Sequence, residues 1–160
     1  MNHSLDAALG DRAVFESGAL NLFLEAMSES VIVTNAGLDE PGPTIVFVNR
    51  ACERVTGYDR KEIVGNTPRM FQGPATSRTE LDRMRRALKA GRPFEGETIN
   101  YRKNGEAFPL RWAVVPIYDD FGSVVAWLSL QSETAHPDGR SLEERAVAVE
   151  KRLHDKDGAK

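Results

Sequence analysis

The stretch Asn49-Arg50-Ala51-Cys52-Glu53-Arg54-Val55-Thr56-Gly57-Tyr58 predicts a short helix near the middle of the chain. Asn49 is a favoured helix N-cap, and Gly57 is a poor helix residue that stops the helix after Val55. A second short helix is expected from Asp59, because Glu62 follows it with the spacing of a capping box. The segments on either side of these two helices decide the fold class.

Strands are predicted both before and after the short helices. Val31–Thr34 and Thr44–Val48 are rich in β-branched residues and are separated by a Pro- and Gly-containing loop, so we expect them to pair as a hairpin. An amphipathic helix is expected over Thr79–Ala90, and strands are expected over 94–102, 107–118 and 123–132. This order predicts an α+β fold, with a five-stranded antiparallel sheet and short helices on one face. Pro68 and Pro74 bracket a segment expected to be irregular.

The chain has 160 residues, which suits one domain with an extension at each end. We divide it into an N-terminal flanking helix (1–29), a central domain (30–133), and a linker with a C-terminal signalling helix (134–160). The first helix has an apolar stripe that packs either on its own domain or on a dimer partner. The second repeats Leu142, Ala146, Val149 and Leu153 at heptad spacing. That spacing favours the start of a two-chain coiled coil over a tail helix folded back on the sheet.

Composition argues against several classes of function. The net charge is −3 without a dense basic block, so we expect no direct nucleic-acid partner. No apolar run approaches membrane-spanning length and no secretory signal opens the chain, so we expect a cytoplasmic protein without a membrane partner. Cys52 is the only cysteine, and the three histidines lie in the flanks, which argues against a metal site in the domain. No phosphate loop or catalytic pair is evident, so we do not expect an enzyme.

Three motifs resemble those of PAS domains, and within them the flavin-binding LOV branch. The stretch quoted above is similar to the PAS pattern N-x-A-F-x-x-x-T-G-Y. Residues 65–73, Gly-Asn-Thr-Pro-Arg-Met-Phe-Gln-Gly, are similar to the LOV pattern G-x-N-C-R-F-L-Q-G. Residues 100–105 with Phe108 match the hairpin motif N-Y-x-K-x-G-x-x-F. The resemblance covers residues 31–132 and implies the PAS fold.

The resemblance also implies a function, a cofactor and partners. A PAS module of this kind senses or relays a signal, forms a homodimer through its flanking helices, and acts on an output domain or kinase partner. The resemblance to the LOV branch implies FMN rather than FAD as the ligand. A flavin mononucleotide needs cations at its phosphate, amides at the edge of its ring and apolar walls around it. A native protein without cofactor is an equal alternative at this point.

Thirteen residues are expected to form the flavin pocket on the strength of this resemblance. Arg69 and Arg85 match the arginines that bind the phosphate, while Gln72, Asn100 and Gln131 match amides that touch the ring. The complete set of expected cofactor-binding residues is Thr34, Thr67, Arg69, Gln72, Leu81, Met84, Arg85, Leu88, Asn100, Leu110, Trp112, Trp127 and Gln131.

The sequence departs from the LOV pattern at positions that matter for photochemistry. Pro68 stands where that pattern has its photoactive cysteine, and proline carries no nucleophile, so a conventional cysteinyl–flavin adduct is excluded there. Thr67 and Leu110 replace ring-binding asparagines, a loss of about 1 kcal/mol each. Cys52 is expected to be a buried core thiol.

Two functions therefore remain open. The first is a relay module with a latent or weak flavin pocket. The second is a LOV-like blue-light or redox sensor that works without the adduct and reports through the Gln131 amide.

Overall fold

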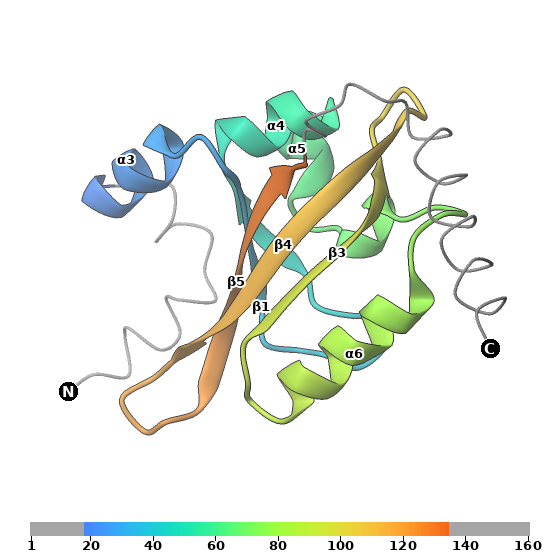
Figure 1. Cartoon of the computed structure of the whole chain (residues 1–160). Coiled ribbons are helices and arrows are strands. Elements are labelled where there is room, and N and C mark those ends of the chain that lie inside the picture. Colours follow the sequence, from blue (N-terminus) through green and yellow to red (C-terminus); the bar gives the residue numbers. More distant parts are fainter. Residues whose placement is uncertain (1–17, 135–160) are drawn as a thin grey trace, which may run out of the picture.

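The computed structural model describes residues 18–134 (Figure 1). Its strands form one antiparallel sheet in the order β2-β1-β5-β4-β3. The strands are β1 (Ser30–Asn35), β2 (Ile45–Val48), β3 (Phe94–Tyr101), β4 (Ala107–Tyr118) and β5 (Val124–Glu133). The expected α+β fold and five-stranded antiparallel sheet are confirmed, as is the pairing of β1 with β2. Strand β5 lies between β1 and β4, so it joins the two groups of strands into one sheet.

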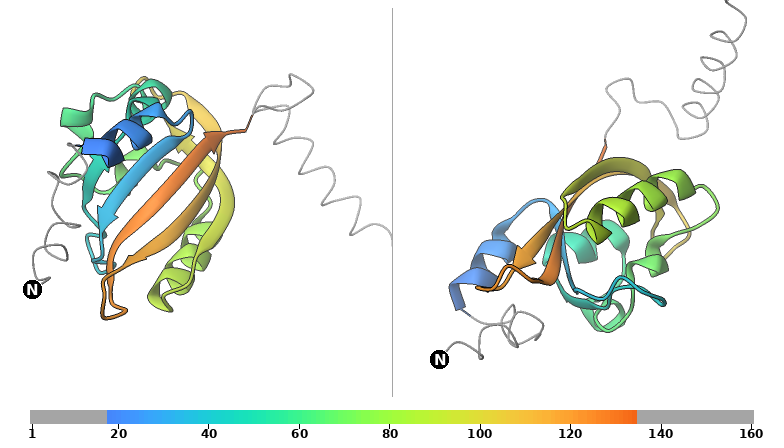
Figure 2. Two further views of the ribbon diagram at one scale, coloured as in Figure 1. Left: turned by 90° about the vertical axis from the view of Figure 1, so that its left-hand side faces the viewer. Right: turned by 90° about the horizontal axis from the view of Figure 1, so that it is seen from below.

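Short helices between β2 and β3 cover one face of this sheet (Figures 1 and 2). They are α4 (Arg50–Thr56), α5 (Arg60–Ile63), the 3₁₀ helix η1 (Pro68–Phe71) and α6 (Arg78–Lys89). Cys52, Ile63 and Phe71 from the first three of these pack with Ile32 and its neighbours in the sheet. The segment after Pro68 is not wholly irregular as expected, because proline at the first helical position favours a helical turn.

Asn49 caps α4 as predicted, and it also ties α4 to more distant parts of the chain. Its side-chain oxygen accepts hydrogen bonds from the backbone N–H groups of Cys52 and Val31, both at 3.0 Å. Its amide donates to the carbonyl oxygens of Leu24 at 2.9 Å and Glu29 at 3.0 Å. The residue is fully buried, so these four bonds join the starts of α4 and β1 to the segment that precedes β1.

That preceding segment contains α3 (Gly18–Ala26), which packs on the other face of the sheet. Leu24 contacts a cluster with Val31 and Val33, whose side chains point away from the short helices. The helix ends at Ala26 rather than at Glu29 as expected, because the chain must turn into β1 at Ser30. The remainder of the predicted N-terminal helix and the whole C-terminal helix lie outside the described residues.

Candidate functional site

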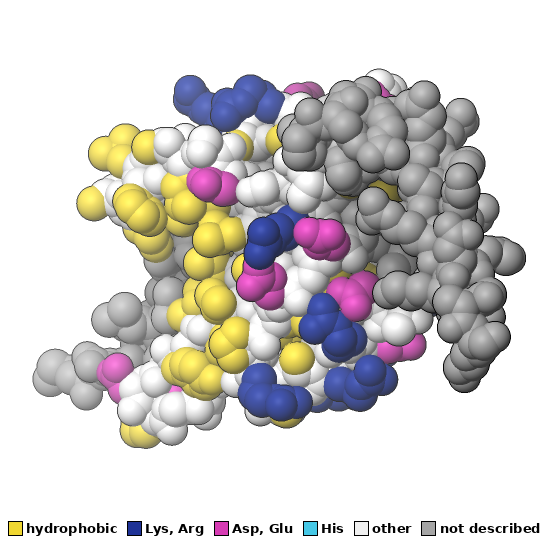
Figure 3. Space-filling view, in the orientation of Figure 1, with side chains coloured by type: hydrophobic (Ala, Val, Ile, Leu, Met, Phe, Trp, Pro, Cys, Tyr) yellow, Lys and Arg dark blue, Asp and Glu magenta, His cyan; other side chains and the backbone are white. Residues whose placement is uncertain are grey.

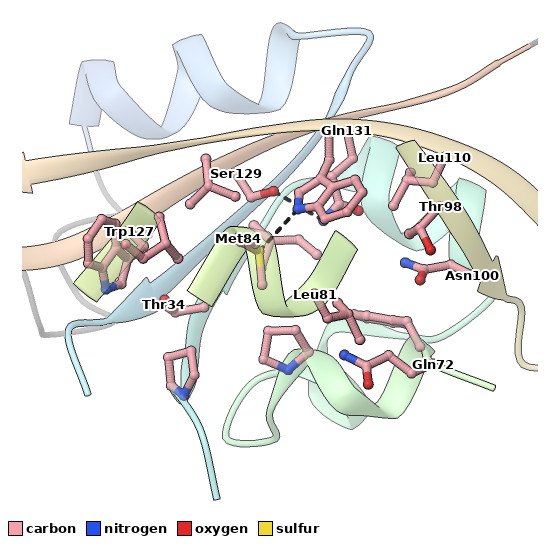
Figure 4. Close-up of a pocket in the computed structure, with 17 residues that line it drawn as sticks. Thr34, Gln72, Leu81, Met84, Thr98, Asn100, Leu110, Trp127, Ser129 and Gln131 are labelled. Atoms are coloured by element: carbon pink, nitrogen blue, oxygen red, sulfur yellow. Dashed lines mark hydrogen bonds between the residues drawn. The ribbon is translucent and has the colours of Figure 1, made fainter. Parts of the chain in front are cut away.

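An inner cavity lies between the sheet and the short helices (Figure 4). Its volume is about 90 Å³, and its walls are mostly apolar. Because side chains alternate along a strand, β1, β3, β4 and β5 each present every second residue to it. Helix α6 closes the other side with Leu81, Met84 and Leu88, one turn apart along the helix.

The polar groups of this cavity are few, and they include three amides and three hydroxyls. The Asn100 side chain is 9% exposed and has no hydrogen-bond partner among residues 18–134. Gln131 is half-buried, and its Nε2 donates to the Ser129 hydroxyl at 3.2 Å. The hydrogen-bond partner of this amide is therefore a side chain of its own strand, β5. The Asn100 amide atoms are not sealed from solvent, so they are available to bind the polar edge of a ligand in the cavity.

An outer hollow of about 470 Å³ adjoins the cavity and carries positive charge. Arg69 and Arg85 border it. Arg69 forms an ion pair with Glu40, and the hydrogen bond from Arg69 lowers the pKa of that carboxyl group. Arg85 is half-buried and has no ion-pair partner within the described part of the chain.

Arg78 and Asp82 also border the hollow, and Arg78 donates to the Gln72 side chain at 3.2 Å. The charge of Arg85 also lowers the pKa of Glu40. Arg85 is thus the half-buried guanidinium of the hollow that can meet an anion.

All thirteen predicted residues border one of these two spaces. Ten line the inner cavity, and the other three, Thr67, Arg69 and Arg85, line the outer hollow. The ten are Thr34, Gln72, Leu81, Met84, Leu88, Asn100, Leu110, Trp112, Trp127 and Gln131. The fold therefore brings the set together, while contact of each residue with a ligand stays a prediction.

Sequence reasoning missed several other lining residues. Ile32, Thr98 and Ser129 also face the cavity. Each of them stands two positions before one of the predicted pocket residues on the same strand. Because side chains alternate along a strand, this spacing is a signal that could have identified them. Pro43 and Phe71 come from a loop and from η1, where no such periodic signal exists.

Cys52 is buried away from both spaces, as expected. Its neighbours are Ile32, Ile45 and Ile63, and it borders neither the cavity nor the hollow. Burial raises the pKa of its thiol to about 11 from an ordinary value of 9.0, a shift that the nearby Ser30 hydroxyl only partly opposes. The thiol is thus neutral and shielded at physiological pH.

This raised pKa predicts a fall in stability at alkaline pH. Between pH 9 and about 11 an unfolded chain loses the Cys52 proton while the folded chain keeps it, so the stabilisation is present below pH 9 and is lost as pH rises. Over this pH window we expect the free energy of unfolding to fall in both proteins. The fall should be about 2 kcal/mol larger in the wild type than in Cys52→Ala. Urea unfolding of both proteins at stepped pH measures the difference, and equal slopes would contradict the prediction.

Residues 18–134 contain no group of three or more His, Cys, Asp or Glu side chains arranged to hold a metal ion. No helix in the same residues is long and apolar enough to cross a membrane.

Comparison with known proteins identifies the family. The model of the PAS domain family matches residues 28–134, which is the sheet with its helices. The chain belongs to the PAS domain family. This PAS domain is similar to phototropin-2 of Oryza sativa subsp. japonica, with 35% identity over 112 residues. It is also similar to the blue-light-activated histidine kinase of Brucella anthropi, with 30% identity over 128 residues.

Solved structures agree with the family. The LOV domain from the Erythrobacter litoralis EL346 blue-light activated histidine kinase has a TM-score of 0.63 and 25% identity, over 69% of this chain and 99% of that one. The curated relatives are much longer than this PAS domain. The matched regions cover 70% and 80% of this chain but only 12% of phototropin-2 and 26% of the Brucella kinase.

Proposed function

We propose that the protein is a sensory PAS module whose pocket binds FMN weakly and whose flanking segments pass the signal to an output domain. One observation carries this proposal: the Asn100 amide has no hydrogen-bond partner within residues 18–134 and lines a largely apolar cavity. That cavity adjoins a hollow where Arg85 forms no ion pair within those residues. Such a cavity suits a ring with a polar edge, and the hollow suits a phosphate.

Each part of the ligand has residues of this chain to hold it. Arg85 and Arg69 are placed to bind the phosphate at the outer hollow. Asn100, Gln131 and Gln72 offer amides to the ring edge, and the indole of Trp127 and the leucines of α6 supply apolar walls. A bound flavin would supply absorption of blue light and a redox centre. The small inner cavity and the ion pair that occupies Arg69 support weak rather than tight binding.

The second candidate is a blue-light or redox sensor in which the flavin is a permanent cofactor. The printed names of the relatives, a phototropin and blue-light-activated histidine kinases, favour it. Pro68 borders both spaces, and Cys52 borders neither, so in this candidate the signal arises without a cysteinyl–flavin adduct. Within residues 18–134 the Gln131 amide is hydrogen-bonded only to the Ser129 hydroxyl, so it is able to reorient.

Binding measurements test both candidates. We expect the purified wild type to bind added FMN in a fluorescence titration, and Arg85→Ala to bind it about tenfold more weakly, because a charge-assisted phosphate contact is lost. Arg86→Ala is the matched control, since this exposed neighbour borders neither space and should leave the affinity unchanged. Equal affinity of Arg85→Ala and wild type would contradict the phosphate role. A protein that is yellow as purified, and keeps its flavin on dialysis, would favour the second candidate.

The proposed dimer rests on a hydrophobic band that is exposed within residues 18–134. Figure 3 shows hydrophobic side chains gathered over α3 and down the adjoining sheet. On α3, Leu22 is 72% exposed and Phe23 is 65% exposed, while Leu24 packs inward. Large exposed apolar patches mark interaction surfaces, and we propose that a second copy covers this one.

Light scattering tests the dimer. We expect twice the chain mass for the wild type and a single chain mass for the double variant Leu22→Glu/Phe23→Glu, because two charges cannot be buried in an apolar contact. Phe121→Glu is the matched control, because Phe121 is still more exposed, at 81%, but lies in the turn between β4 and β5 and not on α3 (Figure 1). A monomeric wild type would rule the dimer out, and a dimeric double variant would show that Leu22 and Phe23 of α3 do not form the interface.

A further inference from the structure

The inner cavity is chemically suited to a flat ring but is too small for one. Its volume is about 90 Å³, whereas pockets that enclose small-molecule ligands measure about 300–1,000 Å³. The outer hollow, at about 470 Å³, is large enough. Both spaces share the lining residues Pro43, Pro68, Gln72, Leu81, Met84 and Leu88, so they are separated by side chains rather than by backbone.

A side chain from the sheet and a side chain from helix α6 meet across the inner cavity. The Trp112 indole N–H, from β4, donates to the Met84 sulfur, from α6, at 3.4 Å (Figure 4). Trp112 borders only the inner cavity, while Met84 borders both spaces. The contact thus links the sheet wall to the helix wall where the two spaces adjoin.

The chemistry of this contact makes it easy to open. A thioether is a weak hydrogen-bond acceptor, and methionine has three rotatable bonds with little preference among their positions. Met84 is also only partly buried, so its side chain has room to move toward the hollow. The other indole of the chain differs, because Trp127 donates to the backbone carbonyl oxygen of Ala36 and is therefore tied to the main chain.

We propose that Met84 and Trp112 form a gate that controls how far a flat heteroaromatic ring enters the inner cavity. This inference rests on the proposed function and names the residues that make flavin binding weak. With the gate closed, the ring stays in the outer hollow near Arg85. With the gate open, the ring reaches Asn100.

The gate predicts that removing it tightens binding. When only an open fraction of the molecules can bind fully, the measured affinity falls by that fraction, so opening the gate permanently restores the loss. We expect Trp112→Phe and Met84→Ala each to bind FMN about tenfold more tightly than wild type. Both are compared because the first removes the donor and the second removes the acceptor. Should one variant fail to fold, as judged by circular dichroism, the other still tests the gate.

The control separates the gate from cavity volume. Trp127→Phe removes the same volume from the same cavity but leaves the Met84–Trp112 contact in place, and we expect it to bring no gain in affinity. Titration with lumichrome, the ring without its phosphate-bearing chain, should show the same ranking, because the gate acts on the ring alone.

The outcomes distinguish this inference from the proposed function. If wild type binds FMN and neither gate variant binds more tightly, or if Trp127→Phe gains as much, the gate is wrong while the flavin pocket stands. If neither wild type nor any gate variant binds FMN or lumichrome, the proposed function fails and the gate fails with it.

Discussion

Replacing Asn49 with alanine is expected to lower the free energy of unfolding by about 3 kcal/mol. The change removes the Asn49 partner from three buried backbone groups, the Leu24 carbonyl oxygen and the N–H groups of Val31 and Cys52, and from the part-buried Glu29 carbonyl oxygen. Loss of a helix cap costs about 1 kcal/mol, and each buried group left unsatisfied costs about 1–3 kcal/mol before relaxation. Urea unfolding of the 160-residue chain, followed by far-UV circular dichroism, measures the loss.

Ser77→Ala is the matched control for this prediction. Ser77 also caps a helix, but its hydroxyl accepts only one bond, from the Glu80 N–H at 3.2 Å, and the site is half-buried. We expect a loss of about 1 kcal/mol there. Comparable losses in the two variants would mean that Asn49 acts as a cap alone, and that its bonds to the segment before β1 contribute little.

The other large effect concerns Pro68. We expect Pro68→Cys, loaded with FMN, to lose its blue absorption band under illumination and to recover it in the dark, whereas the loaded wild type keeps the band. Pro68 lines both the cavity and the hollow, so a thiol there borders the space proposed for the ring. The substitution removes no hydrogen bond, because proline has no N–H and stands at the start of η1.

Pro68→Ser provides the control, since it places a hydroxyl at the same backbone position without a sulfur nucleophile. Wild type provides a second control, because its Cys52 thiol is neutral and lies in a separate core cluster. Both should keep the band. A Pro68→Cys protein that binds FMN but does not bleach would show that the ring does not lie against η1, and the assignment of Pro68 to the photoactive position would be lost.

Local sequence patterns predicted the elements of this PAS domain well. The Asn49 cap and the spacing of Asp59 and Glu62 are patterns of near neighbours, and the Glu62 carboxylate does accept the Asp59 N–H bond, at 2.9 Å. The bounds of β4 agree at both ends because alternation and flanking turn residues mark them. Prediction was less good at η1 and at the end of α3, where the surrounding fold determines whether a helix continues.

The candidate site was predicted through resemblance, and its geometry was not. The resemblance to the LOV branch named thirteen residues, and all of them border the cavity or the hollow. Neither the small size of the cavity nor the unpartnered amide of Asn100 follows from any pattern of neighbouring residues. The Gln131–Ser129 bond likewise depends on rotamers that the sequence leaves open.

The sequence by itself determined which segments form the main helices and strands, which faces of them are apolar, and that position 68 has no thiol, because each of these depends on residues within a few positions of one another. Only the tertiary structure decided that Asn49 joins three segments and that Trp112 meets Met84, since those contacts span long stretches of chain. Such contacts depend on how the short helices pack against the sheet, and the volume that this packing leaves open sets what the pocket can hold.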